Sequence, residues 1–80
     1  MDDIQQRLAN CFRTVFPDLP EAAIPQAEQS NVKDWDSVAA ITLVNVIEEE
    51  FNLELDLDKI ADLDSFDKIA AYLNAAVASR

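Results

Sequence analysis

Apolar residues recur at helical spacing in three stretches of the chain. The first stretch covers residues 3–16, where apolar side chains three or four positions apart form one face of a helix. Pro17 follows and ends this predicted helix, because proline lacks the backbone N–H that a helix interior requires. The face consists of Ile4, Leu8, Cys11, Phe12 and Val15.

The second and third stretches predict two further helices. Residues 36–51 repeat the helical period, and Asn52 is the best available residue to close this helix in the left-handed conformation, because the chain contains no glycine. Asp64 or Ser65 caps the third helix, since either side chain accepts a hydrogen bond from a backbone N–H at a helix start. The apolar face of that helix consists of Phe66, Ile69, Ala70, Leu73 and Val77.

The connections between these helices differ in length and composition. Residues 17–35 hold all three prolines and show no sustained period, which predicts a long loop that Ile24, Val32 and Trp35 pin to the core. The acidic connection after Asn52 has room for a turn or two of helix over residues 57–62. Its alternating run over 54–58 is too short to form a sheet. The sequence therefore predicts an all-α fold, a small bundle of three main helices plus one short helix, with residues 1–80 forming a single domain.

The charge balance restricts the partners. The chain has 16 acidic and 6 basic residues, a net charge of -10, which repels nucleic acid and anionic membrane surfaces. The sequence also lacks the roughly 18-residue apolar run of a spanning helix, and its first ten residues read as an amphipathic helix start rather than a signal peptide. We therefore expect a cytoplasmic monomer whose partners are proteins with basic patches. No stable membrane insertion is expected.

The predicted helix over 36–51 has two different apolar faces. A wide stripe faces the core: Ala39, Ala40, Leu43, Val44, Val46, Ile47 and Phe51. Val38 and Ile41 lie on the other side next to Ser37, where exposed β-branched apolar residues gain nothing from water. This side predicts a docking face made of Asp36, Val38, Ile41, Asn45, Glu48 and Glu49. The alternative is that the long loop covers Val38 and Ile41.

Ser37 is the candidate for chemistry. A nucleophilic serine needs an adjacent base, and the chain has no histidine. We therefore expect no catalytic residue and do not expect the chain to be an enzyme. We expect no metal site either. Ser37 is then either a helix cap or a site of attachment. Asp36 already offers a cap, and a hydroxyl on the first helical turn would present an attached phosphate to free N–H groups and to the positive end of the helix dipole.

The run DSVAAITLVNVIEEEFNLEL, residues 36–55, resembles the Asp-Ser-Leu helix of acyl carrier proteins, and the resemblance continues into DSFDKIAAYL, residues 64–73. It implies that Ser37 carries 4'-phosphopantetheine, transferred from coenzyme A by a holo-carrier synthase, a phosphopantetheinyl transferase. The thiol of this arm would hold acyl groups as thioesters and shuttle them between acyl-transferring, condensing or ligase enzymes with basic docking patches. The apolar core beside residues 39–51 would open to shelter an alkyl chain.

The identity of the cargo stays open at this stage. Carriers of fatty acid synthesis typically read Gly-Ala-Asp-Ser-Leu, whereas this chain has Lys33, Asp34 and Trp35 before Asp36 and Ser37. The Trp-Asp-Ser arrangement is similar to that of specialised carriers and of modules in polyketide or peptide synthesis. The cargo is thus a fatty acyl, unusual acyl, aminoacyl or polyketide group.

Two other functions are consistent with these residues. One is a helical adaptor that is switched by phosphorylation of Ser37. The other is an ion-binding protein that uses the acidic run over 53–67, but this run lacks the glycine of a calcium-binding loop and is typical of a solvated surface.

Overall fold

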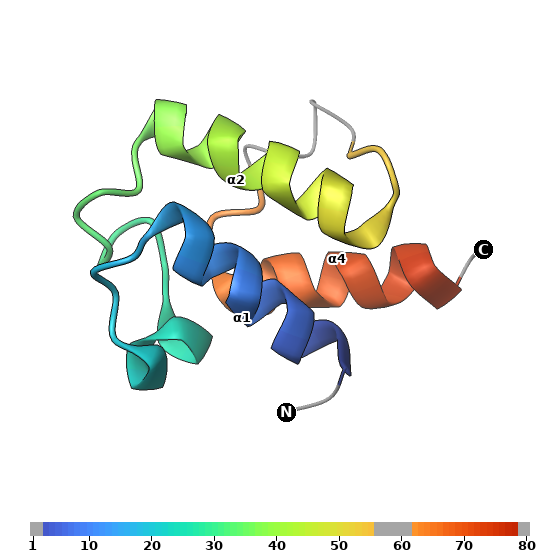
Figure 1. Ribbon diagram of the computed structural model, residues 1–80, viewed down its shortest axis with the longest axis horizontal. Helices are drawn as coiled ribbons and strands as arrows, with labels where there is room; N and C mark the ends of the chain where they lie inside the picture. The colour runs from blue at the N-terminus through green and yellow to red at the C-terminus, as the bar shows by residue number, and fades with distance from the viewer. Residues whose placement is uncertain (1–2, 56–61, 79–80) are drawn as a thin grey trace.

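The computed structural model describes residues 3–55 and 62–78 (Figure 1). In this part of the chain the helices follow in the order α1 (Asp3–Val15), η1 (Glu21–Gln26), α2 (Ser37–Phe51) and α4 (Phe66–Ala78). The described residues form no strand, although Glu28 and Ser65 make an isolated antiparallel bridge. The predicted all-α bundle with three main helices is confirmed. The short helix predicted over 57–62 falls almost entirely on residues 56–61, outside the described residues.

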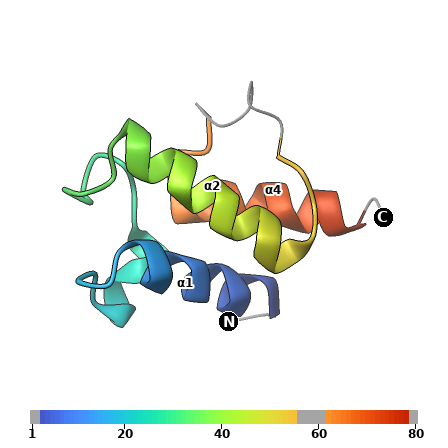
Figure 2. The same ribbon diagram turned by 45° about the horizontal axis from the view of Figure 1, so that its top comes forward.

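The three long helices surround one core. Helix α1 packs against both α2 and α4, and η1 packs against α1 and α4 (Figures 1 and 2). None of the described helices has both the length and the apolar character needed to cross a membrane. The largest fully buried side chains come from every helix: Leu8, Phe12, Ile24, Leu43, Ile47, Phe51, Phe66 and Leu73.

Phe12 of α1 is the centre of an aromatic cluster in this core. Its ring lies 5.4 Å from the ring of Trp35 and 5.4 Å from that of Phe66, centroid to centroid, in edge-on arrangements. Phe16 lies 5.9 Å from Phe12 and 5.8 Å from Trp35. Edge-on and tilted pairs at these separations are favourable because the positive ring edge meets the negative ring face. The cluster therefore joins α1 to the residues just before α2 and to the first residue of α4.

The long loop is more ordered than the sequence predicts. Ile24, Val32 and Trp35 are buried, as expected, but residues 21–26 form the 3-10 helix η1, which the absence of a helical period concealed. A 3-10 helix is short and has no amphipathic period to detect. Burial of Ile24 holds it in place. The loop is also tied to the start of α4, because Gln29 N donates to Asp64 O and Phe66 N donates to Ala27 O, at 2.8 and 2.9 Å.

The helix ends follow the predicted caps with small shifts. Helix α1 ends at Val15 rather than at residue 16, although Phe16 N still donates to Phe12 O at 2.7 Å. Helix α2 begins at Ser37 rather than at residue 36 and ends at Phe51, and its C-cap Asn52 has a left-handed φ of 53°, as predicted. Of the two candidate caps of α4, Ser65 provides the capping oxygen, since its Oγ accepts from Lys68 N at 3.1 Å.

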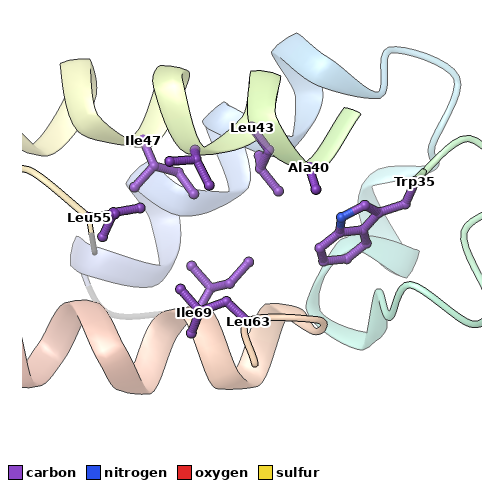
Figure 3. A pocket seen from close by; sticks show the side chains of 8 residues that line it. Trp35, Ala40, Leu43, Ile47, Leu55, Leu63 and Ile69 are labelled. Atoms are coloured by element: carbon purple, nitrogen blue, oxygen red, sulfur yellow. The ribbon is translucent and has the colours of Figure 1, made fainter. Parts of the chain in front are cut away.

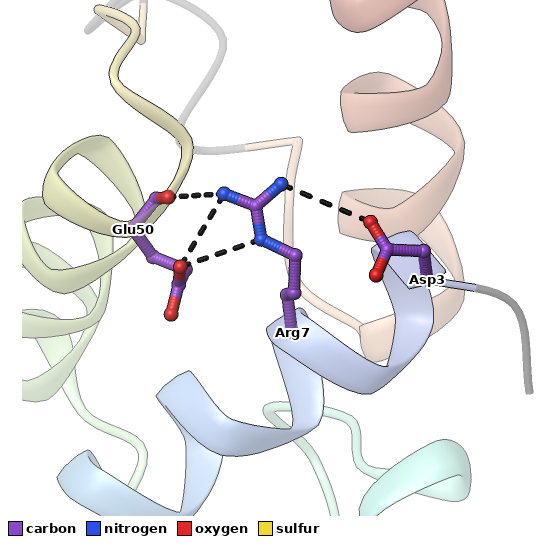
Figure 4. A network of polar contacts seen from close by, with 3 residues as sticks. All are labelled: Asp3, Arg7 and Glu50. Atoms are coloured by element: carbon purple, nitrogen blue, oxygen red, sulfur yellow. Dashed lines mark hydrogen bonds and ion pairs between the residues drawn. The ribbon is translucent and has the colours of Figure 1, made fainter.

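Arg7 joins α1 to the last turn of α2 (Figure 4). Its guanidinium donates to the backbone oxygen of Glu50, pairs with the Glu50 carboxylate at 3.3 Å and approaches Asp3 at 4.0 Å. It also lies over the ring of Phe51, 4.4 Å from the centroid. The last carbonyls of a helix have no partner within the helix, so a cation here satisfies one of them and complements the negative end of the dipole.

We predict that Arg7→Ala lowers the free energy of unfolding by about 2 kcal/mol, the sum expected for a charged hydrogen bond and a cation–π contact. Urea denaturation gives this quantity directly. The matched control is Arg13→Ala, which removes an exposed pair with Glu21 and should cost about 0.5 kcal/mol or less. Equal losses in the two variants would show that Arg7 contributes only as a surface charge.

Cys11, the single cysteine, lies on the buried face of α1. Burial raises the pKa of its thiol from 9.0 to about 11, and the negative charge of Glu50 adds to this effect. The folded state therefore keeps the thiol neutral at pH values where the unfolded chain would release the proton. The thiolate is the nucleophilic form, so Cys11 is unreactive toward thioesters and thiol reagents in the folded protein.

We expect the stability of the wild type relative to Cys11→Ala to fall by about 1–2 kcal/mol between pH 9 and pH 11. A raised folded-state pKa stabilises fully below the unfolded pKa, and the contribution disappears as the pH rises through the folded pKa. Urea denaturation of both proteins across this range measures the difference. A constant difference would contradict a desolvated thiol.

Candidate functional site

Ser37 is the first residue of α2, and its side chain is exposed. The residue before it, Asp36, caps the helix. Asp36 is extended, with φ -101° and ψ -171°, and its Oδ1 accepts from Ala39 N at 2.8 Å. The backbone oxygen of Asp36 accepts the next helical bond, from Ala40 N at 2.9 Å. This is the arrangement of an N-cap residue. Asp36 therefore satisfies the helix start without help from Ser37.

The Ser37 hydroxyl makes no hydrogen bond within residues 3–55 and 62–78. In the same residues, the backbone N–H groups of Ser37 and Val38 also have no acceptor. These are two of the donors that every helix start leaves unpaired, and they carry the positive end of the dipole. A phosphate ester on the Ser37 oxygen would therefore find free donors and a favourable potential nearby. The residues present fit a phosphate-linked group.

Val38 and Ile41 form an apolar patch beside Ser37. Val38 is 72% exposed and Ile41 is 58% exposed, and they are the large hydrophobic side chains that the described core leaves uncovered. Residues three and four apart on a helix are neighbours, so Ser37, Val38 and Ile41 share one surface. The alternative that the long loop covers these two residues is wrong: the loop instead packs inward through Ile24, Val32 and Trp35.

The polar members of the docking face are not equivalent. Asn45 and Glu49 are exposed on α2, as predicted. Glu48 is half-buried, and its Oε2 accepts from Leu55 N at 2.9 Å, so this carboxylate also holds the chain that leaves α2. Asp36 likewise combines an exposed place on the docking face with a structural role, because its Oδ1 caps the helix. Thr42, on the same side, donates its hydroxyl to Val38 O at 3.1 Å.

A wide hollow of about 810 Å³ adjoins the docking face at the other end of α2 from Ser37. It brings Asn45, Glu48 and Glu49 together with residues 52–55, including Glu54, which the sequence did not associate with the docking face. The left-handed conformation of Asn52 folds the chain back toward α2. This turn, which the sequence predicted, was the signal that could have associated Glu54 with the docking face. The hollow adds acidic character to the face.

The charged residues of the docking face, Asp36, Glu48 and Glu49, are all acidic. Among the described cations, Arg7, Arg13 and Lys68 each pair with a carboxylate of their own. Lys33, in the loop before Ser37, is exposed and makes no ion pair within the described residues. Since Asp34, Asp36 and Glu49 are exposed, a cationic partner surface would be attracted here, and the attraction would weaken with salt.

Behind Ser37, a small apolar cavity lies between α2 and α4 (Figure 3). Its volume is about 10 Å³, close to the minimum that holds one water molecule. Trp35 lies at the end beside Ala40, and Leu55 lies at the opposite end (Figure 3). The lining residues are Trp35, Ala40, Leu43, Val44, Ile47, Leu55, Leu63 and Ile69.

The site offers a substrate position rather than catalytic machinery. The chain has no histidine to accept the Ser37 proton, and one oxygen of the neighbouring Asp36 carboxylate is engaged in the cap. The described residues contain no group of three His, Cys, Asp or Glu side chains placed to hold a metal ion. What remains is one exposed hydroxyl on a helix start, flanked by an apolar patch and carboxylates.

Comparisons with known proteins show the family to which the chain belongs. A family model described as a phosphopantetheine attachment site matches residues 6–73. The chain is also similar to acyl carrier protein 3 of Ralstonia nicotianae, with 39% identity over 56 residues. That alignment covers 68% of this chain, and the chain spans 64% of the length of the relative. No solved structure matches the chain.

The matched region contains Ser37, the docking face and the helices that position them. The family's prosthetic group is covalently attached 4'-phosphopantetheine, and its members are carriers of that group rather than enzymes. The resemblance drawn from residues 36–55 and 64–73 is therefore confirmed. The chain belongs to the acyl carrier protein family.

Proposed function

We propose that Ser37 is the residue that carries 4'-phosphopantetheine and that residues 1–80 act as a single carrier domain. The observation that carries this assignment is the division of labour at the start of α2, where Asp36 caps the helix and leaves the exposed Ser37 hydroxyl without a structural task. When attached, the arm supplies a terminal thiol that holds acyl groups as thioesters. A tethered thiol raises the local concentration of its cargo at each enzyme that it visits.

Attachment requires a partner with its own base. The Ser37 oxygen must lose its proton as it bonds to the phosphorus of coenzyme A that bears the pantetheine, the P–O bond of the pyrophosphate bridge breaks, and adenosine 3',5'-bisphosphate leaves. The chain has no histidine, and Asp36 is engaged in the cap, so the phosphopantetheinyl transferase must accept the proton. The free N–H groups at the helix start then stabilise the phosphodiester.

The docking face is the surface that we propose for partner enzymes. Val38 and Ile41 supply an apolar centre next to Ser37, and Asp36, Asn45, Glu48 and Glu49 supply a polar, mostly acidic surround. An apolar centre with a charged rim is typical of protein interfaces, and the acidic rim favours partners with basic patches. The cargo stays open between the products of fatty acid, polyketide and related biosynthesis, with an aminoacyl or peptidyl carrier as the alternative.

We predict that incubation with coenzyme A and a broad-specificity phosphopantetheinyl transferase adds one phosphopantetheine to the wild type and none to Ser37→Ala. Intact-protein mass spectrometry measures the gain. Ser65→Ala is the matched control, since Ser65 is a buried serine that caps α4, and this variant should be modified normally. A gain in Ser37→Ala would place the attachment elsewhere. No gain in the wild type would favour the phosphorylated adaptor.

We further predict that Ile41→Glu leaves the helical content unchanged and lowers the kcat/KM of modification by roughly tenfold or more, because the partner loses one buried apolar contact. The control is Ala71→Glu, which adds the same charge at an exposed position on α4 and should leave the rate unchanged. Steady-state modification assays with both variants test the docking face. Equal rates for Ile41→Glu and the wild type would remove Ile41 from the interface.

A further inference from the structure

We propose that Trp35 limits the size of the cargo that this carrier can shelter, so that it carries short acyl groups exposed to solvent rather than long alkyl chains buried in the core. The inference rests on the proposed attachment at Ser37. It revises the expectation that the core opens readily for an alkyl chain.

Among the described residues, the apolar space between α2 and α4 is small. The cavity between α2 and α4 holds about 10 Å³, room for about one water molecule and not for an alkyl chain. The side chains around it are close-packed, since Leu43 is 2% exposed and Ile47 and Ile69 are 1% and 3% exposed. A chain can enter only if these side chains move apart. Crowding extra methylenes into a packed core is unfavourable.

Trp35 occupies the end of this cavity that lies nearest to the attachment residue. It precedes Ser37 by two residues and lies beside Ala40 of the first turns of α2 (Figure 3). Ala40 is the small residue of the α2 wall, so space at this end would exist if a smaller residue stood at position 35. The indole ring of Trp35 fills that space and is 4% exposed.

The position of Trp35 is fixed by contacts outside the cavity. Its ring is held from the α1 side by Phe12 at 5.4 Å and Phe16 at 5.8 Å, and its backbone N–H donates to Val32 O at 3.0 Å. Moving the ring would break its contacts with Phe12 and Phe16, which join α1 to the residues just before α2. An acyl chain that enters at this end must displace the ring, and the loss of these aromatic contacts opposes the gain from burying its methylenes.

The wide hollow beside the C-terminal end of α2 does not suit an alkyl chain either. It is open to solvent and includes Glu48, Glu49 and Glu54 among the residues that line it. Ionised carboxylates are strongly hydrated, and an apolar chain laid over them would give up water contacts without satisfying them. Neither the small cavity nor the wide hollow beside α2 therefore provides a site for a long alkyl chain.

The test loads the full-length protein with acyl arms of increasing length. A broad-specificity transferase and acyl-coenzyme A substrates from acetyl to octanoyl place each acylated arm on Ser37, releasing the adenosine bisphosphate portion, and mass spectrometry verifies each product. The melting temperature of each form is then measured. For the wild type we expect values that agree within about 1 °C, whereas burial of the chain would raise the melting temperature by about 5–11 °C for each tenfold gain in the folding equilibrium constant. A steady rise with chain length in the wild type would overturn the inference.

Trp35→Ala reports on the role of the side chain itself. It should melt below the wild type when unmodified, and its melting temperature should then rise with acyl length, because the vacated space accepts the chain. Phe16→Ala is the matched control: Phe16 is a 3% exposed member of the same aromatic cluster but does not line the cavity, so its series should stay flat. A flat series for Trp35→Ala would show that Trp35 does not set the limit. If Trp35→Ala fails to fold, Trp35→Leu takes its place.

A second measurement uses the wild type alone. Trp35 is the single tryptophan of the chain, so its emission reports only on this position. We expect the emission maximum to be the same for the acetyl and octanoyl forms, and a shift with chain length would contradict the inference. Failure of the wild type to gain any mass would instead overturn the attachment at Ser37. The two proposals therefore fail by different observations.

Discussion

The contact of Phe12 with Trp35 and Phe66 is the interaction on which the other parts of the fold depend. Helix α1 packs against both of the other long helices, and Phe12 is where it meets the residues before α2 and the start of α4. A chain of 80 residues has room for a single core, so few contacts are available to fix three helices. The aromatic cluster fixes two helix starts at once. The position of Ser37 follows from it, because the burial of Trp35 sets where α2 can begin.

The start of α2 places three consecutive residues in three different environments. Trp35 is buried, Asp36 caps the helix through Ala39 N, and Ser37 is exposed with no structural bond among the described residues. The physical reason is that a helix start needs acceptors for its unpaired N–H groups, and one carboxylate can provide the side-chain acceptor. A hydroxyl that the helix does not use is available for modification. In a carrier, the modified residue must also be reached by several enzymes, which the exposed first turn allows.

The distribution of charge suits reversible contacts. Arg7 is held between Asp3, Glu50 and the ring of Phe51, where it joins two helices, and Arg13 and Lys68 pair with local carboxylates. Three of the four cations that the structure describes are thus used within the protein, whereas the exposed carboxylate of Glu49 on the docking face makes no ion pair within the described residues. Exposed charges give fast, salt-sensitive association and contribute little to tight binding. Such contacts allow a carrier to leave each enzyme after its arm has delivered the cargo.

The sequence by itself determined the three long helices and the caps at Asp36 and Asn52, and it named Ser37 as the candidate site, because helical period and capping are local properties of neighbouring residues. It left the cap of α4 open between Asp64 and Ser65, and the structure selected Ser65. It did not reveal η1, whose short turns have no period and depend on burial of Ile24. Tertiary structure alone decided that Val38 and Ile41 stay uncovered, that Glu48 holds Leu55, and that Trp35 fills the cavity between α2 and α4. These facts depend on which distant segment packs against each side chain, and spacing along one helix carries no information about its neighbours.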